Sequence, residues 1–312
     1  MLTLAWAHWK NPWPGGGISV DRRLFLASGF ALLAAGCTPR GREIVVGSKN
    51  FTEQLILGEL LAQLLSRTCH ASVERRFYLA GTYICQQAIL SGRIDTYVEY
   101  TGTALSAVLK ESYAGDPESV YAQVKSAYKQ RFNLEVMAPL GFNNTFAMVI
   151  RQEDARRMGI TKLSQLAQYA PQMKLGVGYE FLERKDGYQG LVRTYSLKFA
   201  EAPRVMDLGL LYRALENRSV DIVAGNNTDG LIEALGLVVL EDDKHYFPPY
   251  DAVPIVRPQM LNESSCARVI FEQLAGRVSA DQMRRMNYAV DGRKEDAAQV
   301  ATQFLSSEKL IT

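Results

Sequence analysis

The chain has 312 residues, of which 47% are hydrophobic and 22% are charged, and its formal net charge is +2. A chain of this length can bury a full-sized core and commonly forms two compact units. The small net charge and the lack of a dominant basic run argue against nucleic acid as a partner. The three histidines, His8, His70 and His245, have no metal-ligand spacing, so we expect no metal and no other cofactor.

Residues 1–36 have the pattern of an export signal with an N-terminal extension. Arg22 and Arg23 precede an apolar run, Leu24 to Ala35, that is too short to span a bilayer. A twin-arginine signal, a plain basic signal and a buried core helix all remain open for this run. The ending LLAAGC resembles a bacterial lipobox, which makes Cys37 the lipidated first residue of the mature protein. The unusual first 20 residues also fit a start codon placed too early.

Three cysteines follow the predicted signal, namely Cys69, Cys85 and Cys266. An odd number allows at most one disulfide within the chain, and the spacing does not identify a pair. We expect all three to be small buried hydrophobic residues. No segment after the signal is long enough to span a membrane, so the mature chain is expected to be an exported body tethered by lipid.

Short runs rich in valine and isoleucine alternate with helical patterns, which predicts an α/β chain with mainly parallel sheets. Asn50 and Glu53 have the spacing of a near capping box, with Asn50 as the N-cap. The leucines from Leu57 to Leu65 then form one apolar helical face. In this first part we expect strands at 44–47 and 73–78 and helices at 83–91 and 120–131.

A second α/β unit is predicted between residues 146 and 241. Its candidate strands are 147–150, 175–178, 205–208, 221–224 and 238–240. The segment HYFPPYDAVPIV reads as a return crossing, because two prolines stiffen an extended chain. Helices at 280–290 and 295–305 follow. The pattern predicts one lobe formed by 42–142 plus 250–312 and another formed by 143–249.

The catalytic and nucleotide motifs that the sequence suggests are incomplete. Gly47, Ser48 and Lys49 lack the further glycines of a phosphate loop. The S-x-x-K spacing at Ser126–Lys129 lies within a predicted helix and lacks its partner motifs. Since no histidine is placed to serve a nucleophilic triad, we expect that the protein is not an enzyme.

Aromatic and hydrogen-bonding side chains instead gather in the loops that follow the predicted strands. The candidate ligand-binding residues are Lys49, Asn50, Phe51, Gln54, Thr82, Tyr97, Tyr100, Asn144, Thr145, Phe146, Tyr179, Phe181, Arg184, Asn226, Asp229 and Tyr250. An aromatic face attracts a desolvated cation by about 0.5–2 kcal/mol, and Lys49 or Arg184 could hold a carboxylate. The alternative is that about half of these aromatic residues belong to the core. The triplets Asn143–Thr145 and Asn226–Thr228 repeat one pattern, and both are expected to face a cleft.

Six linked motifs resemble the substrate-binding proteins of osmoprotectant ABC importers, which transport glycine betaine, carnitine and choline. They are VGSKNFTEQLILGELLAQLL, GRIDTYVEYTGTAL, GFNNTFAM, GYEFLERKDGYQGL, AGNNTDGLI and DDKHYFPPYDAVPIV. The resemblance covers the chain after Cys37 and implies a two-lobed periplasmic-binding-protein fold of type II with a cleft between the lobes. It also implies a small zwitterionic or cationic ligand, a permease in the inner membrane as partner, and a periplasmic or extracytoplasmic location.

Betaine-binding members of this family surround the trimethylammonium group with tyrosines. Tyr100 and Tyr250 match that cage, whereas Phe146 and Asn226 stand where tyrosine is frequent. A phenylalanine still supplies a ring face, but an asparagine does not. Other readings therefore stay open: a receptor of the same fold for an amino acid or an ergothioneine-like zwitterion, a periplasmic enzyme, or a structural envelope lipoprotein.

Overall fold

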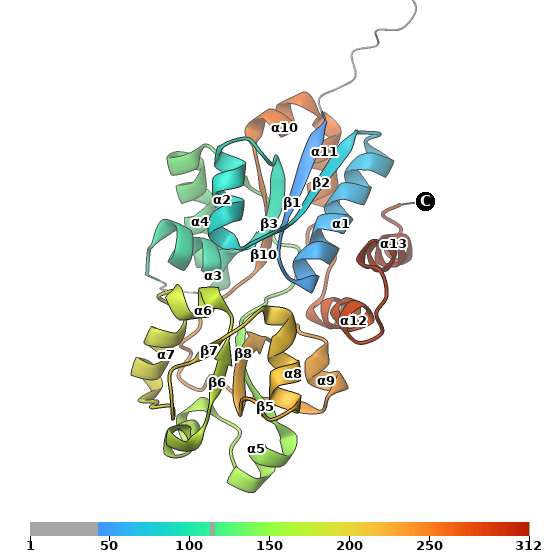
Figure 1. Ribbon diagram of the computed structural model, residues 1–312. Coiled ribbons are helices and arrows are strands. Elements are labelled where there is room, and N and C mark those ends of the chain that lie inside the picture. The colour runs from blue at the N-terminus through green and yellow to red at the C-terminus, as the bar shows by residue number, and fades with distance from the viewer. Residues whose placement is uncertain (1–42, 113–115, 312) are drawn as a thin grey trace, which may run out of the picture. The chain divides into compact units, whose positions relative to one another are not determined.

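The computed structural model describes residues 43–112 and 116–311, and these residues form two separate five-stranded sheets (Figure 1). The predicted export signal and Cys37 lie outside the described residues. Within the described ranges, no helix is both long enough and apolar enough to cross a membrane.

The first sheet combines strands from both ends of the chain. In spatial order its strands are β2 (Val73–Leu79), β1 (Ile44–Lys49), β3 (Thr96–Tyr100), β10 (Ala252–Val256) and β4 (Glu135–Val136). Strand β1 is parallel to both of its neighbours, whereas β10 is antiparallel to β3 and β4. The sheet is therefore mixed, because its C-terminal strand returns against the direction of the others.

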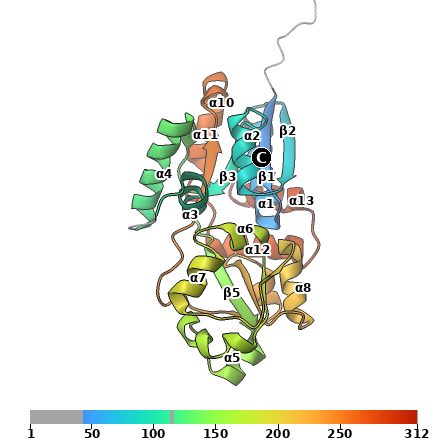
Figure 2. The same ribbon diagram turned by 60° about the vertical axis from the view of Figure 1, so that its left-hand side comes forward.

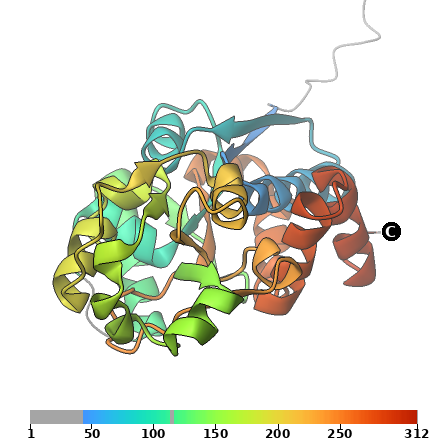
Figure 3. The same ribbon diagram turned by 60° about the horizontal axis from the view of Figure 1, so that its bottom comes forward.

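Helices cover both faces of the first sheet. They are α1 (Thr52–Thr68), α2 (Thr82–Leu90), α3 (Thr101–Thr103), η1 (Ala104–Leu109), α4 (Pro117–Phe132), α10 (Pro258–Glu263), α11 (Ser265–Leu274), α12 (Ala280–Asp291) and α13 (Ala297–Ser307). Figures 1 and 3 show α12 and α13 beside α1, on the opposite side of the sheet from α2 and α4. Segments more than 200 residues apart in the sequence thus share one core.

The second sheet is built from one continuous part of the chain. In spatial order its strands are β7 (Arg204–Val205), β6 (Leu175–Val177), β8 (Ile222–Asn226), β5 (Phe146–Arg151) and β9 (Leu237–Val239). The helices around it are α5 (Gln152–Met158), η2 (Leu163–Gln168), η3 (Ala170–Gln172), α6 (Tyr179–Glu183), α7 (Tyr188–Tyr195), η4 (Leu208–Leu210), α8 (Leu211–Glu216) and α9 (Leu231–Ala234). Strand β5 is antiparallel to β8 and β9, while β6 is parallel to β7 and β8.

The prediction of mainly parallel sheets was therefore too simple, since β5 and β10, each of which follows a passage between the sheets, run antiparallel to both neighbours. The strand predicted at 205–208 is also shorter, because Asp207 accepts a hydrogen bond from the Gly209 amide and starts a helical turn. The remaining predicted strands and helices are present, with ends that differ by a few residues.

Helix α1 forms a large part of the core because its apolar stripe matches the helical period. Leu57, Leu60, Leu61, Leu64 and Leu65 are all buried. Its start differs from the prediction: the N-cap is Phe51, with no side-chain capping bond, so Asn50 is not the cap. Glu53 instead turns its carboxylate into a buried polar network, which removes it from any capping box.

Cys69 and Cys266 form a disulfide that joins the end of α1 to α11 across 197 residues. The expectation that all three cysteines are simple buried hydrophobic residues is wrong for this pair. It fits Cys85, which is free and buried. Sequence spacing could not identify the pair, because only the packing of α11 beside α1 brings the two residues together.

The chain passes between the two sheets twice, and the two passages lie side by side. Asn143 and Asp251 form an antiparallel bridge, and the Asn144 amide donates to the Tyr250 carbonyl at 2.9 Å. These paired connections place residues 144 and 250 between the two sheets.

Candidate ligand-binding site

A cavity of about 510 Å³ is lined by residues from both of the parts of the chain that form the two sheets. Much of its lining comes from the ends of β1, β3, β6 and β8 and from the segments that follow them, while Phe146 begins β5 and Tyr250 precedes β10, the two strands that run in the opposite direction. Strands β1 and β3 are parallel to each other, as are β6 and β8, so in each sheet the carboxyl ends meet at one edge. Ligands bind at such edges in open α/β sheets. Strand direction therefore explains why these particular loops line one cavity.

Five aromatic rings form much of the inner wall, namely Phe51, Tyr100, Phe146, Phe181 and Tyr250. Phe146 lies in edge contact with Phe181 and Tyr250, at centroid distances of 4.9 and 5.6 Å. Phe51 stacks on Tyr100 at 6.5 Å. Gly102 lies so close to Tyr250 that no side chain fits at position 102, because a Cβ there would lie 2.6 Å from the Pro249 carbonyl oxygen and 2.8 Å from Cδ1 of Tyr250.

Both basic residues in the wall are already paired with buried carboxylates. The Lys49 ammonium contacts Glu99, and the Arg184 guanidinium binds Asp186 through two nitrogens. The guanidinium also donates to the Thr103 hydroxyl at 3.0 Å and lies over the Phe146 ring, 4.9 Å from its centroid. Lys49 lies over the Tyr100 ring at 5.0 Å. One face of the Tyr100 ring and one face of the Phe146 ring thus already contact a cation of the protein.

Glu53 is the centre of a buried network that connects the two sheets. Its carboxylate accepts hydrogen bonds from Tyr100 Oη at 2.6 Å, Asn144 Nδ2 at 2.7 Å, Thr228 Oγ1 at 2.6 Å and Asn287 Nδ2 at 3.0 Å. Burial raises the pKa of Glu53, while these four donors act in the opposite direction. The network holds Tyr100, which forms part of the cavity wall.

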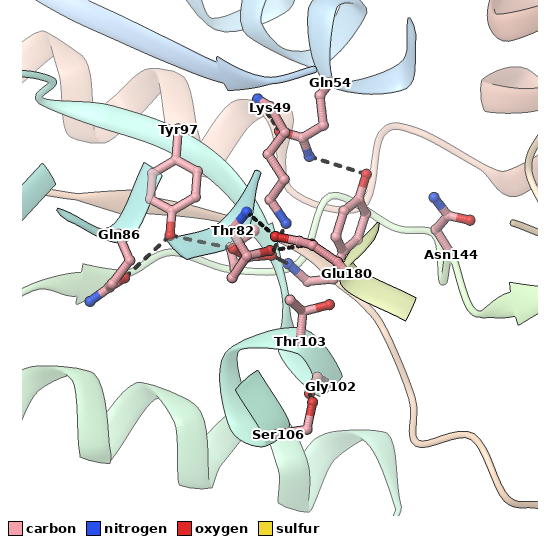
Figure 4. Close-up of polar contacts among 12 residues, drawn as sticks. Lys49, Gln54, Thr82, Gln86, Tyr97, Gly102, Thr103, Ser106, Asn144 and Glu180 are labelled. Atoms are coloured by element: carbon pink, nitrogen blue, oxygen red, sulfur yellow. Dashed lines mark hydrogen bonds and ion pairs between the residues drawn. The ribbon is translucent and has the colours of Figure 1, made fainter. Parts of the chain in front are cut away.

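A second contact between the two sheets involves Glu180 of α6. Its carboxylate accepts from the Thr82 amide at 2.6 Å and from the Thr82 hydroxyl at 3.2 Å. Helix α2 begins at Thr82, and its N-cap, Gly81, has no side chain to offer, so Glu180 supplies the missing cap. Figure 4 shows Thr82 and Glu180 facing each other near Lys49, and Figure 2 shows α6 close to the N-terminal end of α2.

Eleven of the sixteen predicted ligand-binding residues line the cavity. They are Lys49, Asn50, Phe51, Tyr100, Asn144, Phe146, Tyr179, Phe181, Arg184, Asn226 and Tyr250. The triplets containing Asn144 and Asn226 lie against each other, since the backbone N–H of Asn227 donates to the backbone carbonyl of Thr145 at 3.0 Å. This adjacency follows from the pairing of β5 with β8.

The other five predicted residues do not line this cavity. Tyr97 is fully buried, and its hydroxyl lies near Gln86 and Glu99 (Figure 4). Gln54 is buried and donates to Tyr100, while Thr82 is occupied by Glu180. Thr145 is absent from the lining, and Asp229 lines a smaller neighbouring cavity of about 230 Å³. Strand alternation explains why Tyr97 is absent from the cavity: it lies three residues before Tyr100 in β3, so the two side chains point to opposite faces of the sheet.

Several residues of the site were missed from the sequence. Thr103, Glu180, Met206, Asp207 and Leu208 line the cavity, and Glu53 and Asp186 hold its walls. Glu180 was detectable in principle, since it lies between two residues that were predicted. Asn287 carries a weaker signal, namely a polar residue on the buried face of an amphipathic helix.

Two mixed sheets, paired connections and a cavity at the carboxyl ends of the strands define the class of two-lobed solute-binding proteins. The family described as the substrate binding domain of ABC-type glycine betaine transport systems matches residues 42–307. The chain therefore belongs to this family. Within the described residues, no cluster of histidine, cysteine and carboxylate side chains is suited to hold a metal ion.

Two relatives and one solved structure illustrate the similarity. The carnitine transport binding protein OpuCC of Listeria monocytogenes is 33% identical over 264 residues, which cover 84% of this chain and 85% of that protein. The ergothioneine transport permease/ergothioneine binding protein EgtU of Helicobacter pylori is 34% identical over 90% of this chain, but the match spans only 50% of EgtU. The crystal structure of a glycine betaine/carnitine/choline ABC transporter protein aligns with a TM-score of 0.71 and 30% identity, over 86% of this chain and 99% of the other.

Proposed function

We propose that this protein is the extracytoplasmic solute-binding component of an ABC importer, and that its ligand is a quaternary-ammonium solute of the glycine betaine, choline and carnitine class. Family membership supports the role in transport. The observation that supports the ligand class is that five aromatic rings surround one cavity. In the same wall, each of the two basic groups already has an acidic partner.

The charges around the cavity favour a zwitterion or a cation over an anion. Lys49 and Arg184 are the basic groups of the wall, and Glu180 and Asp207 are its acidic groups. Glu99 and Asp186 lie directly behind the basic pair. Since acidic groups outnumber basic ones, an anionic ligand would meet a net negative surface. This charge balance disfavours a receptor for anionic amino acids.

The aromatic rings and the two basic groups of the cavity wall suggest how a zwitterion would lie. Tyr100 and Tyr250 would contact the ammonium head, with Phe146 and Phe181 as further apolar walls. A carboxylate would point toward Lys49 and Arg184, which keep N–H groups beyond those bound to their partners. The Thr103 hydroxyl accepts from Arg184, so its own hydrogen remains available to the ligand.

Binding would proceed by closure of two lobes, formed by 42–142 plus 250–312 and by 143–249, around the paired connections as a hinge. Three contacts support closure: Glu180 with Thr82, Arg184 with Thr103, and Thr228 with Glu53. Each joins a residue of the first group to one of the second.

The disulfide supports an exported location, because such bonds persist mainly in oxidising compartments. In this proposal Cys37 carries the lipid that holds the protein at the membrane. The closed receptor would then deliver its solute to a permease in that membrane.

Calorimetry on residues 38–312 with glycine betaine, choline, carnitine and ergothioneine tests the ligand class. We expect Phe146→Leu, which keeps the apolar volume but removes the ring, to weaken the best ligand by about tenfold. Tyr100→Ala and Tyr250→Ala should weaken it further, whereas Tyr121→Ala, on α4 and outside the cavity, should not. The ligand class is wrong if no quaternary-ammonium solute binds, or if Tyr100→Ala and Tyr250→Ala both leave the affinity unchanged.

A second candidate ligand within this proposal is an ergothioneine-like zwitterion. Asn226 supports it, because its side-chain amide offers two donor hydrogens and an acceptor oxygen to a polar ring, where a tyrosine would offer an aromatic face and one hydroxyl. The similarity to the Helicobacter pylori protein points in the same direction. The calorimetric panel separates the two candidates directly.

A further inference from the structure

The outer part of the cavity differs chemically from the inner part. Tyr83, Ile84, Tyr179 and Val205 line it and remain 41%, 50%, 63% and 48% exposed. Met206 and Leu208 continue the same wall and are half-buried. The charged residues Lys49 and Arg184, by contrast, are buried in the inner wall. The cavity therefore has a charged, aromatic inner part and a largely apolar entrance, where Asp207 is the exposed acidic residue between Met206 and Leu208.

Exposed large hydrophobic side chains gather at this apolar entrance. Eleven large hydrophobic side chains are exposed among residues 43–112 and 116–311, and four of them line this one cavity. Single exposed hydrophobic residues are ordinary, whereas exposed groups of them mark binding surfaces. The water that covers these four side chains could be replaced by apolar groups of a ligand.

The entrance has two walls, which come from different parts of the chain. Tyr83 and Ile84 lie in the first turn of α2, while Tyr179 begins α6 and Val205 ends β7. The bond from the Thr82 amide to Glu180 joins the two helices beside these residues. Because this bond holds the walls together, an extended ligand would contact both of them once the protein is closed.

We propose that this entrance, lined by Tyr83, Ile84, Tyr179 and Val205, is a second subsite that binds an uncharged apolar extension of the ligand. The ligand class is then a quaternary-ammonium zwitterion with an acyl or alkyl substituent, not only a compact solute such as glycine betaine. This inference rests on the proposed function, because the charged head must first occupy the inner part. A compact solute would leave the apolar entrance filled with water.

Calorimetry with carnitine, acetylcarnitine, butanoylcarnitine and hexanoylcarnitine tests the inference on residues 38–312. We expect affinity to rise about two- to fourfold for each added methylene, as for partial to full burial of that group. Ile84→Ser should lower the ratio of hexanoylcarnitine to carnitine affinity by about tenfold. The matched control is Val269→Ser on α11, since Val269 is 49% exposed but lies outside the cavity, and it should leave that ratio unchanged.

The possible results separate this inference from the proposed function. If glycine betaine, choline or carnitine binds but affinity does not rise along the acyl series, the second subsite is rejected and the proposed function stands. The same holds if Ile84→Ser and Tyr83→Ser both leave the ratio unchanged, because the apolar entrance then serves another contact, such as one with a protein. If none of the quaternary-ammonium compounds binds, the proposed function itself fails.

Discussion

Asp229 shows how the surroundings of one residue can make stability depend on pH. Its carboxylate accepts from Tyr212 Oη at 2.6 Å and from the Asn226 amide at 2.9 Å. Burial raises the pKa of Asp229 from 3.8 to about 7, although these two bonds oppose the shift. The nearby carboxylates Glu53 and Asp291 add to the rise, and burial raises the pKa of each of them as well.

The sign of the effect follows from where the proton binds more tightly. Because the pKa of Asp229 is higher in the folded protein than in the unfolded chain, its contribution to the free energy of unfolding is fully present below pH 3.8 and is lost as the pH rises to about 7. Asp229→Asn keeps an oxygen that can accept both bonds but does not titrate. We expect this variant to lose less stability than the wild type between pH 5 and pH 7, by up to about 1.4 kcal/mol per pH unit.

Urea unfolding at several pH values measures this difference. Asp207→Asn is a suitable control, because Asp207 is exposed and the bond described for its carboxylate is the one from the nearby Gly209 amide. Equal pH dependence in wild type and Asp229→Asn would show that Asp229 does not retain its proton in the folded state.

At the scale of the element, the start of α2 depends on Glu180 of α6, which belongs to the part of the chain that forms the second sheet. Gly81 provides no capping side chain, and the Thr82 amide is satisfied by Glu180. In the proposed opening of the two lobes, the Thr82 amide would lose this partner and bind water instead. In the proposed closure, the Glu180 carboxylate would stabilise the closed arrangement by a charge-assisted bond and by its interaction with the positive end of the helix dipole.

We expect Glu180→Ala to raise the dissociation rate of the best ligand by about tenfold, which corresponds to about 1.4 kcal/mol. Glu180→Gln should have a smaller effect, because it keeps the acceptor and loses the charge. Stopped-flow tyrosine fluorescence measures the rate. Glu183→Ala, an exposed residue on the same helix, serves as control. A dissociation rate that is the same in wild type and Glu180→Ala would argue against this contact as a determinant of closure.

Other elements were foreseen from local patterns. The leucines of α1 predicted its buried face, and the strand patterns predicted most of both sheets. The start of α1 was misread, because Asn50 lines the cavity and Phe51 takes the cap position. A capping pattern in the sequence cannot reveal that Glu53 has four better partners from distant segments.

At the scale of the whole molecule, the disulfide between Cys69 and Cys266 joins the N-terminal and C-terminal parts of the first sheet's unit. A crosslink that closes a long loop stabilises mainly by restricting the unfolded chain. We expect the double variant Cys69→Ala/Cys266→Ala to lose about 2–5 kcal/mol of unfolding free energy. Dithiothreitol should destabilise the wild type similarly and leave the double variant unaffected.

Denaturant unfolding with and without the reductant measures both effects, and Cys85→Ala separates the loss of a crosslink from the loss of a buried thiol. A wild type that is equally stable with and without dithiothreitol would contradict the prediction, provided that thiol counting shows the bond to be reduced.

The sequence by itself determined the alternation of strands and helices, the family and most of the aromatic side chains of the cavity. These features depend on residue type and on spacing within one segment, both of which are visible in the chain. Only the tertiary structure decided the partners: Asp186 for Arg184, Glu99 for Lys49, Glu180 for α2 and Cys266 for Cys69. Most of these pairs lie 50 or more residues apart and meet only through sheet order and strand direction. Asp186 is two residues from Arg184, but its role as a buried partner depends on enclosure by Tyr250 and Thr103, which only folding supplies.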